Sequence, residues 1–453
     1  MKSFTGNIVK EYRAQLLVCG LGPAGISACV AAARDGIKVF AVERCAYAGG
    51  NITNANVIGV CGAVNMLTGD LVTGGITKEM LRRTGILRDP VDFNKQYYLS
   101  DIDMDNTRLY EPVSTGDYSR HPNGVSMIYD AELYKHEADD ILKKSGVEFL
   151  YHTVICGVEM DGEDRIRSVV VANKDGLSRI YADMFIDATG DADIAAGSGA
   201  PFEILPDTMQ AGTLMFVMGG VEYDDYAVLK NEIINTFLEC DKRGEMGRYG
   251  GPGIGRLQKG VINFNMTRVK YNSTDTRETT DAEIQTRDDA FRYAALLKKY
   301  MPQFKNAYML YSGPHLGARE SRRIRGEYIL TLDDIKQRKQ FDDVIGLGAN
   351  PIGDFHDPNS NGESKDFKIM GCYEIPYRTL VPLKVNNLLV AGRCHSVTQK
   401  AAASTRVALT ASLMGEAAGR AMSLAFKHNT DPRNINGVEL HDELKAHGGI
   451  FNR

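Results

Sequence analysis

The chain has 453 residues, of which 25% are charged and 43% hydrophobic, and its formal net charge is −5. This length is enough for two or three domains with a large core, and the mildly acidic balance excludes a general attraction to nucleic acid or anionic lipid. The eight cysteines form no C-x-x-C pair, which argues against an iron–sulfur cluster or a zinc knot, and we expect no metal site. Residues 1–14 contain no apolar stretch of the signal-peptide kind, so we expect a cytoplasmic protein that does not bind membranes.

A strand, a helix and a second strand open the chain. The first strand is predicted over the apolar residues 16–18, the helix over the small residues 26–34, and the second strand over residues 37–42, which end at Glu43. A membrane span is the alternative for this apolar stretch, but two glycines and a proline would interrupt it. The pattern therefore predicts a strand–helix–strand unit that either binds a dinucleotide or is only structural.

The turn between the first strand and the helix has the spacing G-x-G-x-x-G. Gly20 permits a tight turn, Gly22 lets a pyrophosphate approach the backbone, and Gly25 lets the helix pack closely on the strand. The N-terminus of the helix offers N–H groups and a positive dipole end to phosphates. Glu43, 18 residues beyond Gly25, stands where a carboxylate accepts hydrogen bonds from a ribose diol. The sequence therefore predicts a dinucleotide site.

The residues that follow Glu43 favour FAD over NAD. Arg44 comes next, and a second glycine pair, Gly49 and Gly50, follows shortly. Glycines here let the backbone pass close to a ribityl chain or to the flavin edge, which NAD-binding units do not usually need.

The segment after this pair combines a long excursion with a predicted helix and three strands. Residues 51–125 are rich in glycine, asparagine and threonine, and we expect them to wrap over the flavin, with a helix at 78–83 and a loop at 101–124. A second helix is predicted over residues 129–145, with His136 on or near its apolar face.

Three strands are then predicted at residues 147–161, 166–176 and 178–190, and the tripeptide Lys-Asp-Gly supplies the turn between the last two.

The middle of the chain changes character. Alternating runs at residues 213–223 and 260–269 predict antiparallel strands, and two helices fit residues 226–240 and 281–299. The sequence GPGIG at residues 251–255 mimics a phosphate loop, but no apolar strand precedes it, and we interpret it as a turn.

Five motifs together resemble a known family. They are GLGPAGISACVAAARDGIKVFAVER at 20–44, the glycine pair, ATGDAD at 188–193, GARESRRIRGEYIL at 317–330, and NLLVAGRCHS with STRVALTASLMGEAAGRA between 387 and 421. Over nearly its full length the chain resembles the FAD-dependent oxidoreductase family of the glutathione-reductase-like fold, related to fumarate reductase flavoproteins and to the flavin subunit of heterodisulfide reductases.

The resemblance implies an α/β fold. It consists of a Rossmann-type FAD-binding domain, with a parallel sheet and a β-meander, and an inserted α+β substrate domain. The FAD-binding domain is expected to be discontinuous, over residues 1–200 and 385–453, with the substrate or cap domain at 201–384.

In the C-terminal piece, residues 387–391 are a predicted strand, and Gly392-Arg393 stands where glutathione-reductase relatives carry Gly-Asp. Residues 407–424 form a predicted helix whose N-terminus faces the flavin pyrimidine, where its dipole stabilises the charge on reduced flavin.

The residues expected to bind FAD lie at strand ends and helix N-termini. They are Gly20, Gly22, Pro23, Ala24, Gly25, Glu43, Arg44, Gly49, Gly50, Gly190, Asp191, Gly392, Arg393, Thr405 and Arg406.

Three residues are candidates for chemistry at the flavin. His395 follows the strand that the resemblance places near the isoalloxazine, and we expect it to act as the base, unless it only packs against the cofactor. Arg319 and Arg322 would clamp a carboxylate, with a structural ion-pair network or a solvated face as the alternatives. Weaker candidates are Tyr373, His121 and His356.

These features favour an FAD-dependent dehydrogenase that moves a hydride from a small organic substrate to flavin N5. Both an anionic and a neutral substrate stay open. The alternatives are a fumarate-reductase-like C=C reductase and a protein that uses FAD structurally in RNA modification. A disulfide reductase lacks support because no paired cysteine motif is present, and a halogenase with the W-x-W-x-I-P motif is excluded because the chain has no tryptophan. The substrate and the electron acceptor stay open, and a homodimer is the default expectation.

Overall fold

The computed structural model describes residues 7–65, 67–84, 127–247, 249–350, 356–359 and 371–452. The strands are β1 (Ile8–Cys19), β2 (Val39–Val42), β3 (Gly59–Val60), β4 (Met127–Ile128), β5 (Glu148–Leu150), β6 (Val154–Asp161), β7 (Arg165–Asn173), β8 (Gly176–Asp187), β9 (Phe202–Glu203), β10 (Phe216–Gly219), β11 (Tyr249–Gln258), β12 (Val261–Thr267), β13 (Tyr308–Ser312), β14 (Arg323–Ile324), β15 (Val344–Gly348), β16 (Tyr373–Pro376) and β17 (Leu388–Val390). The helices are α1 (Pro23–Arg34), α2 (Asn51–Asn54), α3 (Gly75–Arg83), α4 (Ala131–Lys144), α5 (Asp193–Gly197), α6 (Tyr226–Lys242), α7 (Thr276–Tyr300), α8 (Leu332–Lys336), α9 (Gln399–Thr405), α10 (Ala408–His428) and α11 (Gly437–Ala446).

In the described part of the chain, the main sheet has seven strands in the order β5-β2-β1-β8-β7-β6, with β17 paired to β8. Strand β8 pairs with β1 in parallel along its length, while its first half pairs with β7 in antiparallel and its last residues pair with β17 in parallel. The predicted parallel sheet with a β-meander is confirmed. Strand β8 lies between β1 on one edge and β17 on the other, so strands from the two ends of the chain belong to one sheet.

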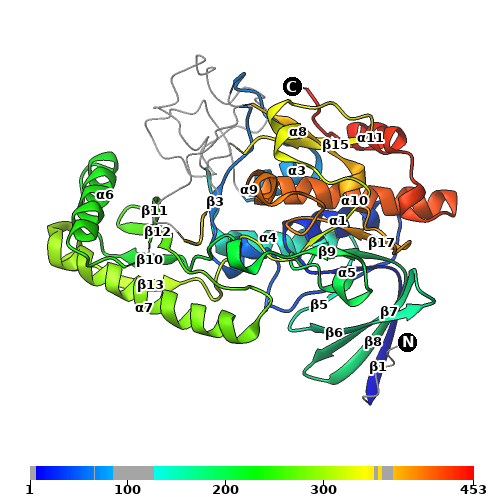
Figure 1. Ribbon diagram of the computed structural model, residues 1–453, viewed down its shortest axis with the longest axis horizontal. Coiled ribbons are helices and arrows are strands. Elements are labelled where there is room, and N and C mark those ends of the chain that lie inside the picture. Colours follow the sequence, from blue (N-terminus) through cyan, green and yellow to red (C-terminus); the bar gives the residue numbers. More distant parts are fainter. Residues whose placement is uncertain are drawn as a thin grey trace.

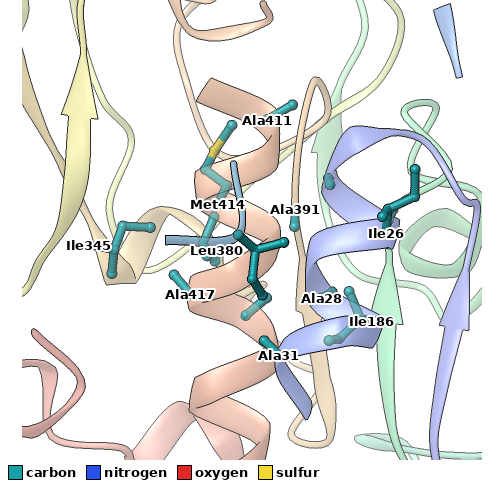
Figure 2. Packing of buried hydrophobic residues seen from close by; sticks show 14 of the residues in the cluster. Ile26, Ala28, Ala31, Ile186, Ile345, Leu380, Ala391, Ala411, Met414 and Ala417 are labelled. Carbon is teal, nitrogen blue, oxygen red and sulfur yellow. The ribbon is translucent and has the colours of Figure 1, made fainter. Parts of the chain in front are cut away.

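Helices α1 and α10 pack against each other on this sheet, backbone against backbone. A Cβ on Gly415 would lie 1.9 Å from the carbonyl oxygen of Ala24, and one on Gly419 would lie 2.5 Å from that of Ala28. Figure 2 shows Ala31 of α1 at the point where the two helices come together, and its Cβ would lie 2.8 Å from a Cβ on Gly419. The small residues of the C-terminal helix therefore let it lie directly on α1.

The cap is a second unit with its own core. A four-stranded antiparallel sheet in the order β11-β12-β10-β13 packs with α6 and α7 at one end of the molecule (Figure 1). The two helices predicted here are confirmed. The predicted turn at residues 251–255 is wrong, because this segment lies inside β11 and pairs with β12. Glycine-rich sequence carries no side-chain alternation, so the strand was not visible in the pattern.

Strands β15 and β16 belong to the FAD-side core, although the sequence assigned them to the cap. Ile345, Tyr373 and Ile375 pack in the same hydrophobic cluster as α1 and α10. The division at residues 201 and 384 stays a prediction. We propose a narrower cap over residues 211–319, in which Gly212 pairs with Val269 and Thr213 with Gly317, and His356 packs on it by accepting the N–H of Ala211.

Two local predictions need correction. Helix α4 buries Tyr134, whereas the side chain of His136 is 76% exposed. The single strand predicted over residues 147–161 is two strands, β5 and β6, because the chain turns at His152, which has a φ of 51°. The predicted loop at residues 101–124, with His121, lies outside the described residues. In the part of the chain that the structure describes, no helix is long and apolar enough to cross a bilayer.

Candidate active site

A cavity lies between the main sheet and the cap. On one side it is lined by the turns after β1, β2, β8 and β17 and by the N-termini of α1 and α10. The opposite wall carries Thr213, Asn265, His315, Arg319 and His356. The ends of parallel strands in an α/β sheet are where cofactors bind, and a cap over them completes a substrate site.

The three glycines of the first turn have three different surroundings. Gly20 has a φ of 91°, and a Cβ there would lie 2.5 Å from the carbonyl oxygen of Ala188. A Cβ on Gly25 would lie 1.8 Å from the carbonyl oxygen of Gly20, so this glycine serves close packing of helix on strand. Gly22 lines the cavity, and a Cβ there would meet only the Cα of Gly50, at 3.7 Å. Gly22 is therefore the point at which a ligand can approach the backbone.

The two helices that point at the cavity have no side-chain cap among the described residues. Four other long helices, α4, α6, α7 and α11, begin at a residue whose side chain accepts N–H bonds from the first turn: Asp130, Asp225, Asp275 and Asn436. Helix α1 begins after Gly22 and α10 after Val407, and both positions line the cavity. The first N–H groups of these helices and their positive dipole ends are thus available to phosphate or carbonyl oxygens of a bound cofactor.

Glu43 lies at the end of β2 and is buried at the cavity wall. Its two carboxylate oxygens accept N–H bonds from Leu21, at 2.8 Å, and from Cys45, at 3.0 Å. These bonds fix the carboxylate beside the glycine turn. Each oxygen has a second lone pair, which suits the predicted contact with a ribose diol.

The Gly392-Arg393 pair departs from the Gly-Asp of glutathione-reductase relatives, and the structure shows a charge pair here. Nη2 of Arg393 donates to the carboxylate of Asp191 at 2.7 Å, and Nη1 of Arg44 lies 4.0 Å from the same carboxylate. Burial raises the pKa of Asp191, but Arg393 and Arg44 outweigh it and hold that pKa below its usual value. Nη1 of Arg393 is buried without a partner among the described residues. It is therefore available to an acceptor atom in the cavity.

The cavity wall includes Pro23, Ala24, Gly50, Gly190 and Arg406. It does not include four of the residues expected to bind FAD: Gly25, Gly49, Asp191 and Thr405. Of these four, Gly49 donates its N–H to the carbonyl of Leu21 and positions the turn from behind.

His395 does not reach the cavity wall. It is fully buried behind that wall, where Nε2 lies 2.8 Å from the hydroxyl of Thr405. Burial, and then the charge of Arg323, lower the pKa of His395 to about 3. A role as the base stays a prediction that this position does not favour, since the strand end expected to present His395 turns it inward.

The charge run at residues 319–323 divides between the site and the scaffold. Arg319 lines the cavity, where Nη1 donates to Thr213 Oγ1 and to the carbonyl of Ala211, both at 2.6 Å. Arg322 instead donates to Asp193 at 2.9 Å, on the loop after β8, and does not line the cavity. Glu320 and Arg323 form a buried ion pair. The structure therefore brings only one arginine of the expected clamp to the site.

Among the residues that the structure describes, His315 and His356 line the cavity, whereas His395 does not. The side chain of His315 is exposed to the cavity, and its Nε2 lies 3.8 Å from the thiol of Cys45. Burial raises the pKa of the Cys45 thiol to about 11. His356 is buried, and its Nδ1 lies 2.6 Å from Nη2 of Arg268. From the sequence, His356 is only a weak candidate, and neither Arg268 nor His315, which stands two residues before the motif at 317–330, has a predicted role. Local spacing does not reveal these roles, because tertiary contacts bring the three residues together. Tyr373, also a weak candidate, lies in the core, bonded to Ser404.

The profile of the family described as FAD dependent oxidoreductase matches residues 15–444. The chain belongs to this family. It is an FAD-dependent oxidoreductase, and the uncapped helices, the open glycine and the cationic Arg393 fit that cofactor. No curated protein sequence matches the chain.

Several solved structures are similar to this chain at low sequence identity. A geranylgeranyl bacteriochlorophyll reductase-like protein from Thermoplasma acidophilum has 11% identity and a TM-score of 0.45, over 96% of this chain and 83% of its own. The myxobacterial chondrochloren halogenase has 14% identity and a TM-score of 0.48, over 96% and 78%. A flavin-dependent brominase has 12% identity and a TM-score of 0.46, over 96% and 83%. At these TM-scores the reactions of these proteins carry no argument for this chain.

Proposed function

We propose that this FAD-dependent oxidoreductase is a dehydrogenase that takes a hydride from a small anionic organic substrate. The supporting observation is the polarity of the cap wall. It carries the positive guanidinium of Arg319 and the imidazole of His356, which is neutral because its pKa is held well below the usual value, and, among the described residues between 213 and 356 that line the cavity, no carboxylate. Arg406 adds a further positive charge from the turn before α10. Fixed cations without a competing anion select a negatively charged ligand.

Each half of the cavity would have its own task. Gly22, Glu43 and the N-termini of α1 and α10 would hold FAD, which supplies a hydride acceptor at flavin N5 when bound. The cap wall would hold and orient the substrate, and the cap itself would exclude water from the flavin. Arg319 is held by three bonds to the cap, to Ala211, Thr213 and Asn265, so its charge would stay fixed while the substrate binds.

Oxidation of an alcohol or amine carbon also needs a proton acceptor. We assign this role to His315, because its side chain lines the cavity and its contact with Cys45 leaves it beside a neutral thiol. The pKa of that thiol is raised, so it carries no charge near neutral pH.

The direct test is anaerobic reduction of the bound flavin by a panel of hydroxy and amino acids, with neutral alcohols of equal size as controls. Bleaching of the flavin absorbance by an anionic donor alone is expected, and His315→Gln should slow it by about 10²–10⁴-fold. Reoxidation of the reduced flavin by fumarate would instead favour the C=C reductase. A flavin that no donor bleaches would contradict the dehydrogenase.

A further inference from the structure

The bond between Arg268 and His356 fixes where the imidazole carries its proton. Arg268 follows β12, is 1% exposed, and places Nη2 2.6 Å from His356 Nδ1. A guanidinium is protonated at every relevant pH and has only donors. Nδ1 must therefore accept, and the proton of a neutral ring lies on Nε2.

The surroundings of His356 keep the ring neutral. Three cations face it: Arg268 from the end of β12, Arg319 from the segment after β13, and Arg406 from the turn before α10. Burial, and then these charges, hold the pKa of His356 well below its usual value. Among the described residues no carboxylate acts on the ring to oppose them.

The backbone of His356 is also anchored. Its carbonyl oxygen accepts the N–H of Ala211 at 3.0 Å, next to the carbonyl that binds Arg319. The ring and the guanidinium are therefore held by the same strip of cap backbone. Both line the cavity.

A ring in this state can donate at Nε2 but cannot accept a proton there. The other tautomer would set Nδ1–H against an N–H of Arg268, two donors facing each other. We propose that His356 is a substrate-binding donor, that its Nε2–H together with Arg319 holds a carboxylate group of the substrate, and that Arg268 is its positioning residue. This inference rests on the proposed function only in that the bound carboxylate belongs to the substrate. Binding of a carboxylate at His356 and Arg319 does not require turnover.

Binding can be measured on the oxidised holoenzyme without turnover. Acetate, oxalate and malonate are titrated against the flavin absorbance, with acetamide and malonamide as neutral controls of the same shape. Saturable perturbation by the carboxylates alone is expected. His356→Phe should raise the dissociation constant by about 10-fold or more, while His356→Gln, which keeps an N–H donor, should restore part of the loss.

The positioning role of Arg268 has its own readout. From pH 5 to 8, binding to the wild-type protein should not vary through His356, because the ring stays neutral. In Arg268→Met burial, Arg319 and Arg406 still keep the ring neutral, but its proton is no longer confined to Nε2, so ¹⁵N-histidine NMR should show Nδ1 partly protonated and carboxylates should bind a few-fold more weakly. His136→Gln, on the exposed face of α4, is the matched control and should change neither property.

Unchanged FAD stoichiometry shows that each variant is folded, and ¹⁵N-histidine NMR of the wild-type protein reports the tautomer if a variant is not. Carboxylates that leave the flavin spectrum unchanged, a dissociation constant that His356→Phe does not alter, or a protonated Nδ1 in the wild-type protein would each overturn the proposal. Carboxylate binding that depends on His356, in a protein whose flavin no donor bleaches, would refute the dehydrogenase and leave this site standing.

Discussion

The two walls of the cavity are built in different ways. The wall on the main sheet is built from backbone, with glycine turns and two helix N-termini that no side chain caps. The wall on the cap is built from side chains, with Arg319, His315 and His356 coming from separate segments. Backbone recognition needs particular residues at fixed local spacing, whereas side-chain recognition needs only that distant residues meet. The first leaves a motif in the sequence and the second does not.

The largest effect is expected where the backbone wall is held together. In Gly415→Ala the new methyl group would lie 1.9 Å from the carbonyl oxygen of Ala24, so α10 could not stay on α1. We expect the free energy of unfolding to fall by about 3 kcal/mol or more, with loss of bound FAD, measured by urea unfolding and by flavin content. Ser423→Ala on the same helix is the control and should be nearly neutral. A stable, yellow Gly415→Ala protein would show that the two helices do not need this contact.

A second glycine should separate binding from folding. In Gly22→Val the Cβ has room, since its nearest neighbour is 3.7 Å away, but the branched side chain would occupy the approach to the backbone. We expect a folded protein whose apoprotein has an unchanged thermal midpoint. Its dissociation constant for FAD, measured by fluorescence titration, should be raised by about 100-fold or more. Normal FAD affinity in this variant would contradict the assignment of the backbone wall to the cofactor.

The charge run at residues 319–323 allows a prediction for the cap wall, because Arg319 lines the cavity and Arg322 does not. Arg319→Ala should raise KM for an anionic substrate by about 10–100-fold with little change in FAD affinity. Arg322→Ala should leave KM unchanged and lower stability instead, since this side chain ties Asp193 on the loop after β8. Steady-state kinetics and thermal unfolding on both variants separate the two roles. Equal KM values in the two variants would make residues 319–323 a purely structural cluster.

The smallest effect is expected at the N-terminus of α3, which is capped by a side chain from another helix, Glu416 of α10. Glu416 of α10 accepts the N–H of Ile76 at the start of α3, at 2.8 Å, and burial raises its pKa to about 7. Arg420, His447 and Arg34 act on the carboxylate in the opposite direction. Between the unfolded pKa, near 4.5, and about 7, the folded state holds a proton that the unfolded state has lost.

The sign of this effect follows from proton linkage. Stability should fall as the pH rises through this window, by roughly 1–3 kcal/mol. Glu416→Gln keeps an acceptor for Ile76 but does not titrate, so its urea unfolding should lack this decline. Identical pH profiles for the two proteins would mean that the carboxyl is ionised throughout.

What could be predicted from the sequence also differs between the backbone wall and the side-chain wall. Gly20, Gly22 and Gly25 could be assigned separate roles because their spacing within one turn dictates them. Arg319 could not be separated from Arg322, since both stand in one charge run and only the folded chain turns one to the cavity and the other to Asp193. His395 was preferred to His356 because it follows a recognisable strand end, while the contact of His356 with Arg268 joins residues 88 positions apart. In β11, glycine removed the side-chain alternation that marks a strand.

The pairing of elements from the two ends of the chain has a consequence for folding during synthesis on the ribosome. Strand β1 and helix α1 leave the ribosome long before β17 and α10, the strand and helix that complete their sheet and cover them. A nascent chain would expose the first glycine turn, without its partner helix, until α10 has been synthesised. Capture of the cofactor is therefore a late event, and the apoprotein before that moment is the form that chaperones and proteases would meet.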